Sequence, residues 1–131
     1  MTVSPIEIGN LLKYVTENKD IRSNLNIDQT CTIDAGDPKP LIKIFNYLIN
    51  YLNQINEGVI DISLKEQSAG CLLCLIISTS SNQLPPMSEK LQDALKFYNA
   101  AMRIVFEEGK FVQILINFCD GYVPDQVIIE V

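Results

Sequence analysis

Residues 36–52 read GDPKPLIKIFNYLINYL, and they predict the helix around which the rest of the chain is arranged. Asp37 is a good N-cap, and Pro38 suits the first helical position. The apolar residues that follow recur three and four positions apart and form one stripe to be buried: Leu41, Ile44, Phe45, Leu48, Ile49 and Leu52. Asn46 and Asn50 lie one turn apart and share a side of this helix. Because asparagine is a mediocre helix former, the pair calls for an explanation.

The segments around this helix alternate helices with pairs of strands. The stretch from Cys71 to Ser78 is continuously apolar, which predicts a central strand covered on both faces. The order αββαββαββ predicts a single α+β domain over residues 1–131, a two-layer α/β sandwich with a mixed sheet and its helices on one face. The expected helices are 5–18, 37–55 and 88–108; the expected strands are 21–27, 31–33, 59–64, 71–78, 111–118 and 123–131, with a hairpin turn at 119–122.

Composition limits the classes of function. The chain has 131 residues, of which 47% are hydrophobic, enough to bury a core without disulfides or metals. The net charge of −6 and the lack of a basic run argue against nucleic acid and anionic membranes as partners. The sequence has neither an apolar run of membrane-spanning length nor the features of a signal peptide. We therefore expect a cytoplasmic protein, and Met1 ahead of a well-capped helix favours a natural start.

The sequence contains no histidine, which removes phosphohistidine chemistry, histidine bases and histidine metal ligands together. Candidate nucleophiles such as Ser80, Ser81 and Cys74 have no visible base beside them. The four cysteines (Cys31, Cys71, Cys74 and Cys119) lie in strand-like contexts, where free buried cysteine is common. Cys71 and Cys74 have a metal-like spacing but would point to opposite faces of a strand, so we expect no metal site.

Asp-Pro ahead of an apolar helix with Asn-x-x-x-Asn, followed by Gly58 and a strand, resembles the N box of histidine-kinase-type ATPases. This superfamily, called GHKL or Bergerat, also includes gyrase and MutL. The resemblance implies that Asn50 matches the residue that holds the magnesium bridging the nucleotide phosphates. Asn46 resembles the kinase branch, since the hydrolysing members have glutamate there. The order of elements, including Leu84-Pro85-Pro86 after a strand, resembles this fold along nearly the whole chain.

The nucleotide-binding motifs of the family are not matched. Counting back from Pro85 puts Thr79, Ser81 and Gln83 where the family has the aspartate and glycines of Asp-x-Gly-x-Gly. Counting back from residues 103–105 puts 95–98 on the Gly-x-Gly motif, where the predicted helix runs straight through instead of cradling phosphate. The segment between Pro86 and Leu95 is too short for the family's mobile lid. Tyr51 replaces the small alanine that follows the magnesium asparagine.

These losses imply a degenerate, non-catalytic pseudo-ATPase domain with no cofactor, acting as an interaction module in two-component-type signal transduction. Its partner would be a kinase, a response regulator or a second copy. The alternative is a diverged histidine kinase or ATPase domain that still binds ATP and magnesium through Asn50, with Lys96 or Lys110 on the phosphates. Less favoured are a phosphotransferase, which would need the missing histidine, and a small-ligand site near Asn50, Thr79 and Tyr98.

The predicted groove between the helices 37–55 and 88–108 is a candidate interaction surface, with the first helix as a second candidate. Its expected bordering residues are large or apolar: Tyr51, Leu84, Met87, Phe97 and Tyr98. An equally favoured interpretation is that these side chains fill the empty pocket as core. Tyr47, Tyr51, Phe97 and Tyr98 are expected to be core or groove aromatics and not a stacking platform.

Overall fold

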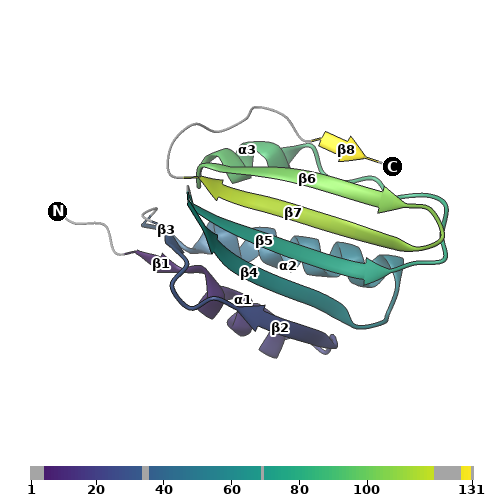
Figure 1. Cartoon of the computed structure of the whole chain (residues 1–131), viewed down its shortest axis with the longest axis horizontal. Coiled ribbons are helices and arrows are strands. Elements are labelled where there is room, and N and C mark those ends of the chain that lie inside the picture. The colour runs from purple at the N-terminus through teal and green to yellow at the C-terminus, as the bar shows by residue number, and fades with distance from the viewer. Residues whose placement is uncertain (1–4, 34–35, 69, 120–127, 131) are drawn as a thin grey trace.

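The structure is a computed structural model that describes residues 5–33, 36–68, 70–119 and 128–130. Figure 1 shows helices and strands alternating along this part of the chain. In order they are β1 (Ile6–Glu7), α1 (Ile8–Glu17), β2 (Ser23–Ile27), β3 (Thr32–Ile33), α2 (Lys39–Ile55), β4 (Ile60–Gln67), β5 (Gly70–Ser78), α3 (Lys90–Lys96), β6 (Ala100–Glu107), β7 (Phe111–Cys119) and β8 (Ile128–Glu130).

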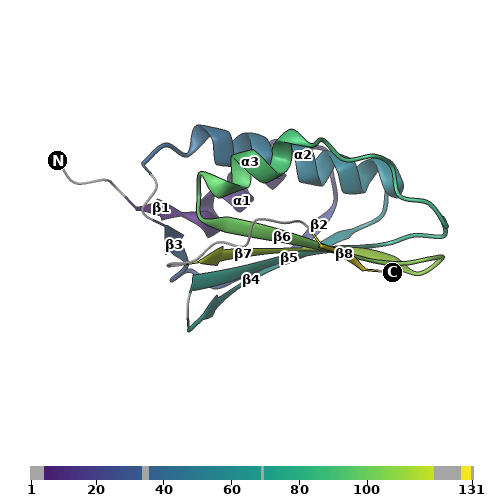
Figure 2. The same ribbon diagram turned by 90° about the horizontal axis from the view of Figure 1, so that it is seen from above.

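Within the described residues, one six-stranded sheet has the order β2-β4-β5-β7-β6-β8, and β1 and β3 form a separate two-stranded sheet. The sheet is mixed, because β2 pairs with β4 and β6 pairs with β8 in parallel, while the other neighbours are antiparallel. Figure 2 shows α1, α2 and α3 on one face of this sheet. The predicted two-layer sandwich is confirmed, and so is the predicted hairpin of β4 and β5.

The core lies between the sheet and the helices. The predicted stripe of α2 is buried, with Leu41, Phe45, Leu48 and Leu52 all at 0% exposure. Every second residue of β4 to β7 is buried against these helices, as the pleat of a strand requires: Ile60, Ile62 and Leu64 from β4; Cys71, Leu73, Leu75 and Ile77 from β5; Ala100, Met102, Ile104 and Phe106 from β6; and Val112, Ile114, Ile116 and Phe118 from β7.

The first two helices begin later than predicted. Ile6 and Glu7 pair with β3, so α1 begins at Ile8 and not at residue 5. The α2 helix begins at Lys39, whose backbone N–H donates to the Asp37 carboxylate at 3.0 Å. The Asp37 carboxylate therefore accepts a bond from the first helical residue, but the N-cap position is Pro38, one residue later than the sequence indicates.

The prediction of a helix over 88–108 is wrong beyond residue 96. The α3 helix ends at Lys96, Asn99 takes a positive φ of 52°, and the chain returns as strand β6. The predicted hairpin between the last two strands is also wrong, because β8 pairs with β6 and not with β7. Its turn at 119–122, like the predicted strand start at 123, falls mainly outside the described residues.

The cysteines depart partly from the expectation of free thiols. Cys31 and Cys71 form a disulfide that ties the segment before β3 to β5. Cys74 is free and lies on the opposite face of β5, as the alternation of a strand predicts. Within the described residues, no three acidic, cysteine or histidine side chains cluster so as to hold a metal ion. None of the described helices is long and apolar enough to cross a membrane.

Candidate functional site

The flank of α2 that faces α3 is occupied by two tyrosines. Figure 1 shows α2 lying between α1 and α3. The Tyr51 hydroxyl donates a hydrogen bond to the carbonyl oxygen of Pro85 at 2.6 Å, and the Ser88 backbone N–H donates to the Tyr47 hydroxyl at 2.7 Å. The two rings stack with their centroids 6.4 Å apart. These bonds tie the loop between β5 and α3 to the side of α2.

Asn46 and Asn50 do not face this loop. The Asn50 side chain is exposed, and its Oδ1 accepts a hydrogen bond from Lys19 Nζ at 3.0 Å, just beyond the end of α1. Successive residues are about 100° apart around a helix, so the asparagine pair and the tyrosine pair point in different directions. The side of α2 next to the loop therefore carries Tyr47 and Tyr51, whereas Asn50 points toward α1.

The loop residues Thr79, Ser81 and Gln83 use their polar groups on one another and on the β6–β7 turn. The Thr79 hydroxyl accepts the Ser81 N–H at 3.0 Å, and the Ser81 hydroxyl donates to the Gln83 carbonyl at 3.0 Å. The Thr79 N–H donates to the carbonyl of Lys110, and the Gly109 N–H donates to that of Ser81, both at 2.9 Å. Such serine and threonine turns stabilise a loop without a ligand. Within the described residues, no hydrogen bond joins any of these three residues to Asn50.

Tyr98 joins the end of α3 to the start of α2. Its hydroxyl donates to the Asp37 carbonyl at 2.7 Å and accepts the Leu41 backbone N–H at 3.0 Å. The Leu41 N–H is one of the groups that a helix start leaves without an intrahelical partner, so Tyr98 caps α2 from the side. Burial raises the pKa of Tyr98, because a charged phenolate would lose its hydration there.

The segment 95–98 does not form the continuous helix that the sequence predicted. The N–H groups of Tyr98 and Asn99 close a tight turn onto the carbonyls of Leu95 and Lys96. Residues 103–105, which belong to the predicted helix 88–108, lie in strand β6. The comparison of 95–98 with a phosphate-binding motif rested on that helix, so it loses its basis.

The predicted interaction surface is mostly interior. Tyr51 and Tyr98 are only 4% and 3% exposed, so they are core residues and not an exposed surface. Leu84 and Met87 are half-buried and pack against the same core. Phe97 differs, since its ring is 62% exposed and lies edge-on against the Tyr98 ring at 5.0 Å. Four of the five side chains thus lie in the core or pack against it.

A shallow groove does run between α2 and α3. Its cavity volume is about 240 Å³, and its floor and walls are mainly apolar. The lining residues are Pro40, Lys43, Ile44, Tyr47, Ser88, Lys90, Leu91 and Ala94. Of these residues the sequence indicated only Tyr47 as a groove aromatic, because helical periodicity does not show where two helices face each other. Ile44, Tyr47, Leu91 and Ala94 do have the i, i+3 spacing of two facing helices.

Solved structures with the same fold are domains of histidine kinases. The histidine kinase domain of the E. coli osmosensor EnvZ has a TM-score of 0.71 at 9% identity, over 96% of this chain and 94% of that one. The ATP-binding domain of PrrB from Mycobacterium tuberculosis has a TM-score of 0.67 at 14% identity, covering 91% and 98%. Acinetobacter baumannii histidine kinase AdeS has a TM-score of 0.68 at 9% identity, covering 93% and 70%.

At such low sequence identities, the structural similarity shows the fold and not the activity. No protein-family model matches the sequence, and no curated protein sequence matches it significantly. The chain therefore has the fold of histidine kinase ATPase domains, as its resemblance to the N box implied.

Proposed function

We propose that this domain is a non-catalytic relative of histidine kinase ATPase domains that acts by binding a protein in two-component-type signalling. The observation that carries the proposal is the pair Tyr47 and Tyr51. They stand on the side of α2 next to α3 and bind the Pro85 carbonyl and the Ser88 N–H. A loop held on the helix in this way supports the loss of the nucleotide site, because the two tyrosines occupy the side of α2 that faces the loop.

The groove that remains is small for a nucleotide and has the wrong chemistry. Its volume of about 240 Å³ is below the range of roughly 300–1,000 Å³ usual for ligand pockets. Phosphates bind to free backbone N–H groups and to cations, but the N–H groups of Thr79, Ser81 and Gln83 already have partners. Lys110 forms an ion pair with Glu107 at 2.8 Å, and this partner raises the pKa of Lys110.

The alternative, in which ATP and magnesium are held through Asn50, would require two hydrogen bonds of this structure to break. Asn50 would have to leave Lys19, and the loop would have to leave Tyr51. We infer that the domain uses no cofactor and is not an enzyme.

For the partner we favour the groove between α2 and α3. Its apolar floor is flanked by Lys43 and Lys90, and the exposed Phe97 ring lies just past the end of α3. An amphipathic helix with acidic residues beside its apolar stripe would match this surface. We infer that the partner is a kinase or a response regulator in the cytoplasm.

A nucleotide titration tests the loss of ATP binding. Calorimetry with ATP and magnesium, run beside an ATP-binding histidine kinase domain, should show no binding tighter than a Kd of about 1 mM, which corresponds to about 4 kcal/mol. A micromolar isotherm that Asn50→Ala abolishes would establish the alternative instead.

Quantitative affinity purification tests the interaction. The wild-type domain should enrich a kinase or a response regulator, and Ala94→Glu, in the groove, should lose it. Gln54→Glu is the matched control, because Gln54 is exposed near the other end of α2 and outside the groove. Equal enrichment by both variants would place the partner elsewhere.

A further inference from the structure

The Cys31–Cys71 disulfide joins the smallest sheet of the fold to a central strand. Cys71 lies in β5, which pairs with both β4 and β7. Cys31 directly precedes β3, which forms a separate sheet with β1, and each of these strands has 2 residues. A two-stranded sheet alone is at best marginally stable in water. Figure 1 shows this small sheet at the end of the molecule where β5 begins. The disulfide therefore fixes a marginal element to a rigid one.

The same cysteine holds the start of α1. The backbone N–H of Ile8, the first residue of α1, donates to the Cys31 carbonyl oxygen at 3.2 Å. This N–H is one of the groups that a helix start leaves without an intrahelical partner. The β1–β3 pair lies directly beside this bond. The position of Cys31 thus controls both the β1–β3 pair and the first turn of α1.

The turn that precedes Cys31 has anchors of its own. The Asp28 N–H donates to the carbonyl of Leu64 at 2.8 Å, and the Glu66 N–H donates to the Asp28 carboxylate at 3.2 Å. Because these bonds to β4 do not involve the sulfur atoms, reduction frees the chain after Cys31 and leaves the turn in place. The two cysteines then stay near each other. Their Cα atoms are 6.0 Å apart, and disulfides span about 4.4–6.8 Å, so the bond can form again.

A cavity lies beside the β1–β3 pair. Its volume of about 430 Å³ is within the range of roughly 300–1,000 Å³ usual for ligand pockets. Its walls come from β1, α1, β3 and the segment before α2: Pro5, Ile6, Glu7, Asn10, Leu11, Thr32, Gly36 and Pro38. The first helix is also the second candidate interaction surface of this domain. The disulfide therefore determines the shape of a surface that includes part of that helix.

We propose that Cys31 and Cys71 form a reversible redox switch, which orders the β1–β3 pair and the start of α1 when oxidised and releases them when reduced. The switch rests on the cytoplasmic location inferred above, because disulfides of cytosolic proteins are mostly transient and redox-sensing. The signal is a rise in oxidised glutathione or another small disulfide. Order–disorder transitions of a segment are an established way to switch a protein surface.

The oxidation is a thiol–disulfide exchange in two steps. Cys31 and Cys71 are 1% and 6% exposed, so the marginal β1–β3 pair opens first. The Cys71 thiolate, near the β4–β5 turn, attacks oxidised glutathione, forms a mixed disulfide and releases one reduced glutathione. The Cys31 thiolate then displaces the second one. The protein gives up two electrons and two protons, which convert one glutathione disulfide into two thiols.

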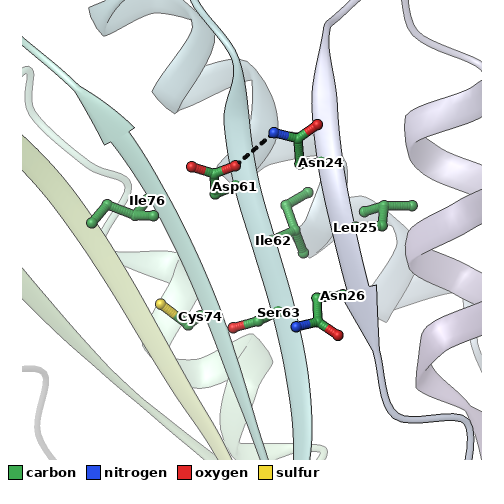
Figure 3. Close-up of a pocket in the computed structure, with 8 residues that line it drawn as sticks. All are labelled: Asn24, Leu25, Asn26, Asp61, Ile62, Ser63, Cys74 and Ile76. Carbon is green, nitrogen blue, oxygen red and sulfur yellow. Dashed lines mark hydrogen bonds between the residues drawn. The ribbon is translucent and has the colours of Figure 1, made fainter.

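Cys74 provides the matched control, because it lies on the other face of the same strand. Figure 3 shows Cys74 beside Ser63 of β4, with Ile76 further along β5. Cys71 is separated from it by three positions, so the alternation of the strand directs their side chains to opposite faces. Cys74 Sγ accepts a hydrogen bond from the Gln113 amide at 3.1 Å. Cys74→Ser should therefore leave the switch intact.

Amide hydrogen exchange followed by NMR tests the switch. The whole chain with Cys74→Ser and Cys119→Ser retains only the pair. Reduction should speed the exchange of the Ile8 amide by at least about 10-fold. The Thr79 amide, bonded to Lys110 just after β5 ends, should change far less. Oxidised glutathione should restore slow exchange at Ile8, and adding Cys31→Ser should reproduce the reduced protein in both buffers.

Thiol trapping with mass spectrometry gives a second measurement, on the wild-type chain. In a glutathione buffer as reducing as the cytoplasm, both thiols of the pair should be free, and an excess of oxidised glutathione should close the bond. Cys74→Ser should behave in the same way.

A bond that stays closed in the reducing buffer, or that does not form in the oxidising one, would overturn the proposal. Equal exchange at Ile8 in the two forms would also overturn it, and so would a reduced protein that circular dichroism shows to be unfolded. None of these outcomes involves nucleotide or partner binding, so the switch and the proposed function fail separately.

Discussion

Removing the Tyr98 hydroxyl should destabilise the domain measurably. Tyr98→Phe keeps the buried ring but removes the bonds to the Asp37 carbonyl and from the Leu41 N–H. Each net bond contributes about 1 kcal/mol, and a buried N–H without a partner costs about 1–3 kcal/mol, so we expect a loss of about 2–3 kcal/mol. With an unfolding entropy of about 2.1 cal/mol/K per residue, this lowers the Tm by about 7–11 °C.

The matched control is Tyr14→Phe, which removes the same atom from a tyrosine that is 56% exposed. It should change the stability by no more than about 0.5 kcal/mol. Both variants are compared with the wild-type protein by thermal and urea unfolding, followed by circular dichroism. If Tyr98→Phe melts within about 2 °C of Tyr14→Phe, then Tyr98 does not cap α2 as described.

Two further predictions concern the Cys31–Cys71 disulfide and Asp28. The disulfide closes a loop of 40 residues, so its reduction should lower the free energy of unfolding by about 4 kcal/mol and lower the Tm. The reductant should have no such effect on Cys71→Ser and should keep its effect on Cys74→Ser. Equal melting of the wild-type protein with and without a reductant would refute this. In the cytoplasm, where disulfides are rare, the reduced form would be the relevant one. The Thr30 hydroxyl, with the backbone N–H groups of Thr30 and Glu66, lowers the pKa of Asp28. Its stabilisation is therefore present above the ordinary pKa of 3.8 and is lost as the pH falls through the lowered folded-state value, so Asp28→Asn should flatten the acid limb of a stability–pH curve.

The elements with strong periodicity could be predicted from the sequence. The apolar stripe of α2 could only be that of a helix, and the apolar run of β5 strongly favoured a central strand. The order of helices and strands led to the correct two layers. The segment 88–108 failed because it fits two periods. Leu91, Leu95 and Met102 suit a helix, but Met102, Ile104 and Phe106 also alternate as in a strand. Pairing with β7, a contact distant in sequence, decides between them.

The site could be predicted only in part for a related reason. The sequence indicated that α2 borders the candidate site, but not which side of the helix faces that site. Turning the helix by about 100° about its axis would put Tyr47 and Tyr51 where Asn46 and Asn50 had been. Only the position of the loop at Pro85 shows which of the two pairs faces it. The disulfide was missed because Cys31 and Cys71 meet through the fold and not through any local spacing.

The order of strands in the sheet also affects how the chain is made. The central strand β5 pairs with β4, which precedes it, and with β7, whose last residue is synthesised roughly 40 residues after β5 ends. At about 5–20 residues per second, one edge of the most apolar strand stays without its partner for several seconds. An unpaired apolar edge is a site of aggregation. Chaperone dependence during translation should therefore centre on β5 and end when β7 emerges from the ribosome.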